Sequence, residues 1–239
     1  MGDLETKLDW MRDGEDFFSA ALSALENDQL GERGLLPGWT RSEIVAHVAR
    51  NADALQNLLH WARTGEETPM YASPGQRDAD IAEGALRPPA ELRDNAASAS
   101  RSLRAAVDSL PSSAWEASVR TARGRTVPAT EIPWMRCREV WIHGVDLDAG
   151  SGFDAVRRDV ALALIDDVVT GLAARGDCPA VVLVSSEDEN RSWALGPDSG
   201  AVVVEGTPSA LLAWVSGRSS GDSLSPRDRA AVPALPGWL

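Results

Sequence analysis

The chain contains three histidines, His47, His60 and His143, and one of them has a carboxylate one helical turn away. Glu139 and His143 are four residues apart, which on a helix is about 40° around the axis, so their side chains stack on one face. Hydrophobic residues flank that face, so Glu139 is expected to point at least partly inward. An inward carboxylate needs a partner, because burying an isolated charge costs several kcal/mol.

His47 supplies a second imidazole from an earlier helical segment. It lies at the edge of that segment's hydrophobic stripe, facing the inner side of the predicted helix bundle. A metal ion coordinated by His47, Glu139 and His143 would satisfy all three side chains at once. Two imidazoles and one carboxylate suit Zn²⁺ with open positions, and the same donors suit non-haem Fe(II). Inward ligands on facing helices are the usual way for a bundle to build a metal site.

Simpler interpretations of these residues stay open at this point. A histidine at the edge of a stripe is often a core or boundary residue, and a Glu–His pair at this spacing is often a surface pair. His60 points away from His47 and is expected to be a surface or packing residue. Asp146 and Asp148 are expected to cap or solvate the end of their helix.

Helical periodicity dominates the first 150 residues and supplies the elements that must position these groups. It predicts four helices, over residues 4–27, 41–64, 89–110 and 130–147. The second begins at a capping box formed by Thr40 and Glu43, and the fourth begins with Thr130 as its cap. The segment Glu66–Leu86 is polar and contains Pro and Gly. We predict it to be a long connector, which inside a compact domain is usually functional or disordered.

After Gly150 the pattern changes. A helix is predicted over residues 155–175, followed by three strand-like runs at 180–185, 191–195 and 201–205. Thr207 and Pro208, a cap followed by proline at the first helical position, begin a last helix. The predicted fold class is α+β: a metal-binding four-helix bundle over residues 1–150, followed by a small α+β domain over residues 151–239.

Composition excludes several classes of function. The 239 residues carry a net charge of −13, which argues against a nucleic-acid binder because phosphate contacts need clustered Lys and Arg. The longest hydrophobic runs are far shorter than the roughly 20 residues that span a bilayer, and the acidic N-terminus does not resemble a signal peptide. Cys137 and Cys178 form no CxxC motif and are expected to be unreactive. We expect a reduced, cytoplasmic protein with no membrane partner, and the pattern is compatible with a monomer.

Segments along nearly the whole chain resemble the mycothiol-dependent maleylpyruvate isomerases, a family of DinB/YfiT-like metal-binding bundles. The ligand-helix patterns are shared with the wider superfamily. The sequence TGEETPMY at residues 64–71, together with Arg77 and Arg218, is more specific to the isomerases. The resembling segments lie at residues 36–52, 59–77, 124–147, 213–222 and 236–239.

This resemblance implies a DinB-like bundle in which His47, Glu139 and His143 bind zinc rather than iron. It implies that mycothiol supplies a thiolate that adds to a C=C bond, which permits rotation and elimination, so that 3-maleylpyruvate becomes 3-fumarylpyruvate in the gentisate route of aromatic breakdown. The substrate is a small diacid, and Arg77 and Arg218 are the residues implied to hold it. The second domain would then contribute to the active site, with residues 66–86 as a wall or lid.

Two alternatives of other classes remain. A mycothiol S-transferase, or another thiol-dependent detoxifying enzyme on the same scaffold, would keep the three metal ligands without needing Arg77 and Arg218 for a diacid. A non-catalytic zinc-binding regulator would tolerate loss of both arginines. Their presence in matching sequence contexts favours the isomerase.

Overall fold

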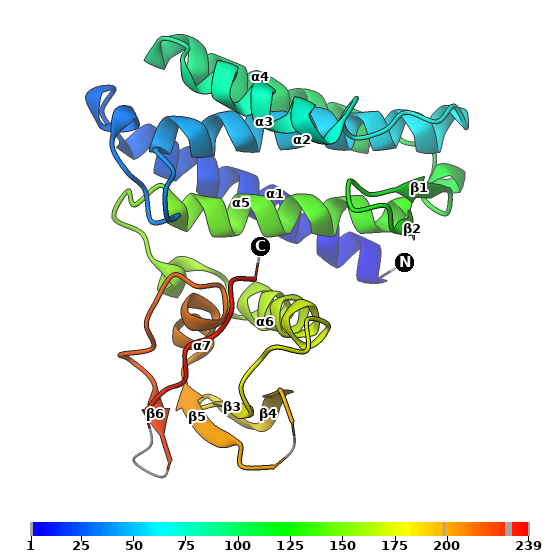
Figure 1. Ribbon diagram of the computed structural model, residues 1–239. Helices are drawn as coiled ribbons and strands as arrows, with labels where there is room; N and C mark the ends of the chain where they lie inside the picture. The colour runs from blue at the N-terminus through cyan, green and yellow to red at the C-terminus, as the bar shows by residue number, and fades with distance from the viewer. Residues whose placement is uncertain (1, 198, 228–230, 239) are drawn as a thin grey trace. The chain divides into compact units, whose positions relative to one another are not determined.

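The computed structural model describes residues 2–197, 199–227 and 231–238 and divides the chain into two compact units, Met1–Gly150 and Ser151–Leu239 (Figure 1). The first unit is mainly helical, and the second combines helices with a sheet. The predicted α+β class is confirmed.

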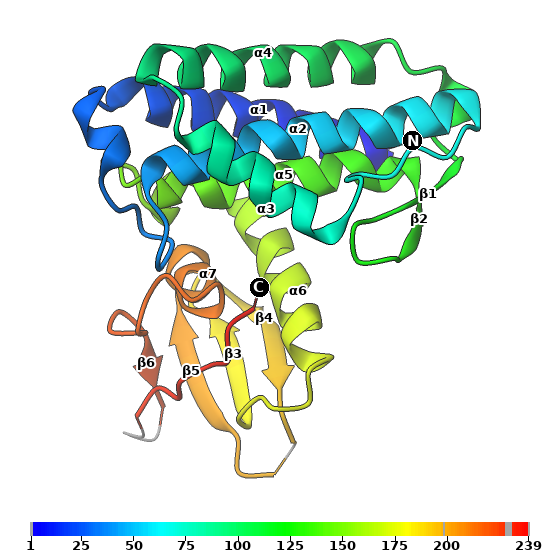
Figure 2. The same ribbon diagram turned by 45° about the horizontal axis from the view of Figure 1, so that its top comes forward.

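Four long helices form the first unit. They are α1 (Gly2–Ala24), α2 (Arg41–Thr64), α4 (Pro89–Asp108) and α5 (Ile132–Asp146). Helix α1 packs along α5, and α2 packs against both α4 and α5 (Figure 2). Hydrophobic residues from all four helices are buried between them, among them Met11, Ile44, Leu55, Leu103 and Val140. Burial of these side chains provides most of the stability of such a bundle.

The ends of α2 are set by local chemistry. The Glu43 amide donates to Thr40 Oγ1 at 3.3 Å, and the Thr40 amide donates back to Glu43 Oε2 at 2.7 Å. The predicted capping box is therefore present. Gly65 ends the helix with a φ of +78°, a left-handed conformation that costs glycine little.

Thr40→Ala is expected to lower the free energy of unfolding by about 1 kcal/mol, because one amide at the start of α2 loses its acceptor. Urea denaturation measures this effect. Ser73→Ala is the matched control, since Ser73 precedes a helix without a side-chain cap hydrogen bond. Equal losses for the two variants would contradict the capping role of Thr40.

The predicted polar connector between α2 and α4 is in part a helix, α3 (Pro74–Ala85), which packs on α2. Its sequence has one large aliphatic residue, Ile81, which is buried. Gly84 lets α3 approach closely, because a Cβ there would lie 3.1 Å from the Cβ of Ala46. Close contact between small residues leaves little hydrophobic periodicity, so the sequence pattern gave no helical signal here.

Short elements complete the first unit. The antiparallel strands β1 (Ser118–Arg120) and β2 (Thr126–Pro128) form a hairpin.

The fourth predicted helix begins differently from expectation: a 3₁₀ turn, Ala129–Glu131, precedes α5, and Glu131 rather than Thr130 occupies the cap position. Pro133 lies in the first turn of α5, where its missing N–H costs no helical hydrogen bond. Further 3₁₀ turns lie at Asp28–Gly31 and Ser112–Ala114.

The second unit contains the helices α6 (Arg158–Ala173) and α7 (Pro208–Val215), a 3₁₀ turn (Phe153–Ala155), and the strands β3 (Val181–Ser185), β4 (Asp188–Leu195), β5 (Val202–Gly206) and β6 (Ser225–Pro226). The strands form a four-stranded mixed sheet with the order β4-β3-β5-β6. Strand β3 pairs in parallel with β5 and antiparallel with β4, and β6 pairs antiparallel with β5. Helix α7 contacts β3 and β5, and α6 contacts β4.

Within the described part of the chain, no helix combines the length and the hydrophobicity needed to cross a membrane.

Candidate metal centre

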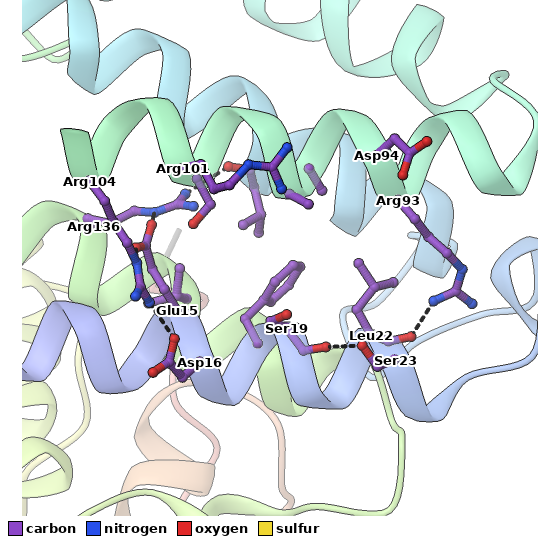
Figure 3. Close-up of a pocket in the computed structure, with 16 residues that line it drawn as sticks. Glu15, Asp16, Ser19, Leu22, Ser23, Arg93, Asp94, Arg101, Arg104 and Arg136 are labelled. Atoms are coloured by element: carbon purple, nitrogen blue, oxygen red, sulfur yellow. Dashed lines mark hydrogen bonds and ion pairs between the residues drawn. The ribbon is translucent and has the colours of Figure 1, made fainter. Parts of the chain in front are cut away.

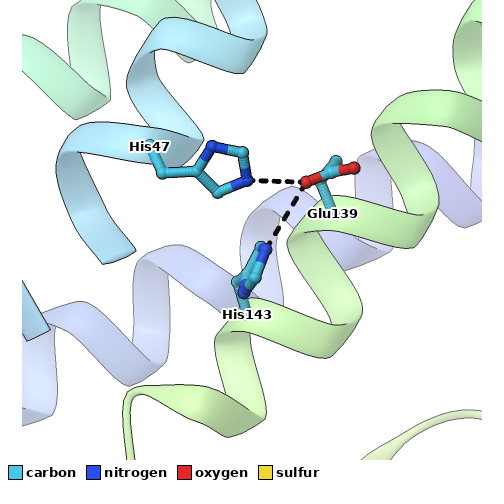
Figure 4. Close-up of side chains that lie close together, drawn as sticks. All are labelled: His47, Glu139 and His143. Atoms are coloured by element: carbon cyan, nitrogen blue, oxygen red, sulfur yellow. Dashed lines mark hydrogen bonds and ion pairs between the residues drawn. The ribbon is translucent and has the colours of Figure 1, made fainter. Parts of the chain in front are cut away.

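The structure brings His47 of α2 against Glu139 and His143 of α5 (Figure 4). His47 Nε2 lies 2.8 Å from Glu139 Oε2, and His143 Nε2 lies 3.4 Å from the same oxygen. The two imidazole rings are nearly perpendicular, at 89°, with centroids 4.8 Å apart. Both histidines are buried. The i,i+4 pair is therefore an interior pair, and the surface interpretation of Glu139 and His143 is wrong.

The three side chains offer one donor atom each, and these atoms lie within 4.8 Å of one another. Zinc–nitrogen and zinc–oxygen bonds of about 2.0–2.1 Å at tetrahedral angles place donors roughly 3.3 Å apart. The cluster thus needs only small side-chain adjustments to hold such an ion. Three protein donors leave a fourth position open, as catalytic zinc sites do.

Electrostatics at the cluster favour an ionised carboxylate between two imidazoles. Burial opposes the charge on Glu139, but hydrogen bonds with His143 and His47 outweigh burial and hold the pKa of this carboxyl well below its usual value. At His47, by contrast, burial is the dominant effect and lowers the pKa despite the hydrogen bond to Glu139. A neutral imidazole and a carboxylate are the forms that bind metals.

Asp146 is a member of the site that sequence reasoning misplaced. It was expected to cap or solvate the helix end, but it is completely buried, and its Oδ2 lies 2.8 Å from His143 Nδ1. Burial lowers the pKa of His143, yet the contacts with Asp146 and Glu139 outweigh burial and raise it. Asp146 therefore holds the ring of His143 with Nε2 toward Glu139, which is the arrangement by which carboxylates orient metal-binding histidines.

Asp146→Asn is expected to weaken zinc binding about tenfold, because the amide keeps the shape of the side chain but not the charge that supports His143. Competition with a chromophoric chelator measures the affinity. Asp148→Asn makes the same chemical change two residues away on a side chain that is 53% exposed, and it should leave zinc affinity unchanged. If the Asp146→Asn and Asp148→Asn variants bound zinc with the same affinity, Asp146 would have no role in supporting the site.

Arg77 of α3 lies beside the cluster. Its Nη2 is 3.4 Å from His47 Nδ1, while its Nη1 donates to Asp78 at 2.8 Å. The side chain is 35% exposed, so the guanidinium is open to solvent as well as to the histidine. Helix α3, which the sequence pattern did not predict, is the element that places this charge next to the metal ligands.

Two aromatic residues that sequence reasoning did not assign also border the cluster. The indole of Trp39 meets the His47 ring edge-on, with centroids 5.8 Å apart. Burial and the Glu139 charge raise the pKa of Tyr71, while Arg77 opposes this rise through its charge and a hydrogen bond. Tyr71 is thus a neutral hydroxyl close to both Arg77 and Glu139.

The remaining predicted residues have other surroundings. Arg218 belongs to the second unit, where it follows α7 and donates from Nη1 to the Ser216 carbonyl at 2.6 Å. His60 is exposed, which agrees with a surface residue. Cys137 and Cys178 are both buried thiols.

Comparisons with known proteins agree along the whole chain. Residues 11–148 match the family model described as the mycothiol maleylpyruvate isomerase N-terminal domain, and residues 155–235 match the MDMPI C-terminal domain. Two solved structures, a mycothiol-dependent maleylpyruvate isomerase and a histidine-to-alanine mutant of such an isomerase, are each 39% identical to the chain. Each has a TM-score of 0.93, covering 98% of this chain and 97% of the other. No curated protein matches significantly.

Proposed function

Because the chain belongs to the mycothiol-dependent maleylpyruvate isomerase family, we propose that it catalyses the cis–trans isomerisation of maleylpyruvate to fumarylpyruvate with mycothiol as the thiol. The observation that carries the proposal is the buried His47–Glu139–His143 cluster with the Arg77 guanidinium at its edge. A metal-binding donor set beside the partly exposed guanidinium of Arg77 suits a reaction of a small carboxylate substrate.

We assign zinc to the cluster, with His47, Glu139 and His143 as its ligands. When bound, zinc supplies a Lewis acid that can hold a sulfur as thiolate or polarise a carbonyl oxygen. The donor set fits the ion in type, number and spacing. The buried Asp146 carboxylate supports this assignment, because metal-binding imidazoles commonly donate their other N–H to a carboxylate, as His143 Nδ1 can to Asp146.

When bound, mycothiol would supply the sulfur nucleophile: its addition would make the C=C bond single and free to rotate, and its elimination would restore the double bond and return the thiol. The chain's own thiols are poorly suited to this task. Cys137 is fully buried, and burial raises the pKa of Cys178. A nucleophilic cysteine needs the opposite, a partly exposed and electropositive setting that lowers its pKa.

Arg77 is proposed to bind one carboxylate of the substrate. A dianion approaching a chain of net charge −13 needs local cations, and a guanidinium matches a carboxylate in two-point contact. A neutral His47 that binds a metal through Nε2 carries its proton on Nδ1. Nδ1 could then not accept a hydrogen bond from Arg77, so metal binding would leave Nη2 of the guanidinium available to the substrate.

The second unit is proposed to supply Arg218 for the other carboxylate. Helix α7 ends at Val215, and the carbonyl of the next residue, Ser216, accepts a hydrogen bond from the Arg218 side chain. The support for this role is the match of residues 155–235 to the family's C-terminal domain.

The experiment that tests the function follows maleylpyruvate by its ultraviolet absorbance, with and without mycothiol, while free thiol is titrated in the same samples. An isomerase requires mycothiol but returns it, so the thiol concentration stays constant over many turnovers. Consumption of one thiol per substrate would instead indicate an S-transferase. Absence of turnover in zinc-loaded protein with mycothiol present would contradict the proposal.

A further inference from the structure

A second buried polar cluster lies in the first unit, next to the metal centre but outside it. Its centre is Arg136 of α5, which is 2% exposed and is among the largest fully buried side chains. The partner on α1 is Glu15, whose side chain is 1% exposed. A buried arginine and a buried carboxylate are costly to desolvate, so a fold that keeps them needs every polar atom held in place.

Arg136 joins three helices through one guanidinium. Its Nε donates to Glu15 Oε1 of α1 at 3.0 Å. Its Nη1 donates to two acceptors of α2, the Val48 carbonyl at 2.7 Å and Asn51 Oδ1 at 3.0 Å. These contacts cross between α5 and α2, the two helices that carry the metal ligands.

The positions of these contacts along the helices are informative. On α5, Arg136 comes three residues before Glu139 and seven before His143, so the three side chains share one face. On α2, the acceptor Val48 follows His47 directly, and Asn51 is one turn further on. The α2–α5 interface therefore has two adjacent polar layers, the metal ligands and the Arg136 contacts.

Glu15 lies beside a cavity in the first unit and has a second cationic partner there. Helices α1 and α4 leave a cavity of about 370 Å³ between them, lined by residues that include Glu15, Arg104 and Arg136 (Figure 3). Glu15 Oε2 accepts from Arg104 of α4 while its other oxygen accepts from Arg136. Glu15 thus anchors Arg136 on the side of the bundle that borders this cavity, and is itself held by Arg104.

We propose that Arg136 is a positioning residue for the metal centre: anchored by Glu15, it fixes the spacing between α2 and α5 that holds His47 opposite Glu139 and His143. This inference rests on the proposed metal site. Metal sites loosened by small shifts of their supporting groups lose affinity, because the ligands no longer reach the ion together.

The test separates positioning from stability with the double variant Glu15→Leu/Arg136→Met. Replacing a buried ion pair by hydrophobic residues often leaves stability unchanged or raises it, so the melting temperature should be retained. Zinc affinity, measured by chelator competition, should fall about tenfold or more, and the absorption spectrum of the Co²⁺-loaded protein should change. Double-variant protein with wild-type zinc affinity and an unchanged Co²⁺ spectrum would overturn the inference.

Two further variants keep the result interpretable. Arg104→Met removes the other partner of Glu15 but no contact between α2 and α5, so zinc affinity should stay within about twofold of wild type. If the double variant does not fold, Asn51→Ala, which removes one acceptor of Arg136 on α2, should weaken zinc binding several-fold, and unchanged affinity would reject the proposal. Failure of the wild-type protein to bind zinc at all would instead reject the metal site itself.

Discussion

Glu139→Gln should abolish both zinc binding and isomerisation. The amide keeps the size of the side chain but removes its negative charge. That charge lies on Oε2, which is 2.8 Å from His47 Nε2 and 3.4 Å from His143 Nε2. A neutral amide is a poor zinc ligand, and two imidazoles alone do not make a stable site. We expect kcat/KM to fall by about a thousandfold or more, corresponding to the several kcal/mol that metal catalysis supplies.

The measurement combines metal analysis of the purified variant with the isomerisation assay. Glu116→Gln is the matched control, because Glu116 is exposed in the same unit, and it should keep wild-type zinc and activity. A Glu139→Gln protein that retains stoichiometric zinc would show that the carboxylate is not a ligand. A variant that loses zinc but keeps turnover would show that the metal is not needed for catalysis.

Arg77→Ala and Arg218→Ala should lower turnover without loss of zinc. Each variant leaves one substrate carboxylate without its two-point partner. Truncating one member of a desolvated charge pair typically costs 2–5 kcal/mol, which is about 30-fold or more in kcat/KM. The lysine variants should recover part of the loss, since they restore the charge but not the planar fork.

The control for both arginines is Arg123→Ala, a change at an exposed arginine of the first unit, which should have wild-type kinetics. Loss of zinc in Arg218→Ala would contradict the substrate-binding role assigned to it. Wild-type kinetics in both arginine variants would favour a thiol transferase that acts on an uncharged substrate, or a regulator.

The sequence predicts those features that depend on residues close together along the chain. Thr40 and Glu43 identify the start of α2 because a capping box is formed by residues three apart. The spacing of Glu139 and His143 places them on one face of a helix, whichever way that face points. What spacing alone left open was the direction of the face, which depends on α2 packing against α5.

The features that escaped prediction depend on packing between distant segments. Helix α3 is held on α2 by close contacts such as that of Gly84 with Ala46, which produce no hydrophobic stripe. Asp146 has the i,i+3 spacing to His143 that could have indicated a contact, but a carboxylate at a helix end usually faces solvent. Its complete burial follows from the surrounding fold.

The buried Arg136 illustrates the same limit more strongly. Its partner Glu15 is 121 residues away along the chain, and both residues look like ordinary surface charges of amphipathic helices. Only the packing of α1, α2 and α5 shows that one guanidinium reaches both neighbouring helices.

Titration of metal-free protein with zinc, in the presence of mycothiol and maleylpyruvate, shows whether isomerisation depends on a metal held by His47, Glu139 and His143. Activity should be negligible before zinc is added and should rise until about one zinc per chain is bound, since the described residues form one such cluster. Full activity of the metal-free protein would contradict this dependence.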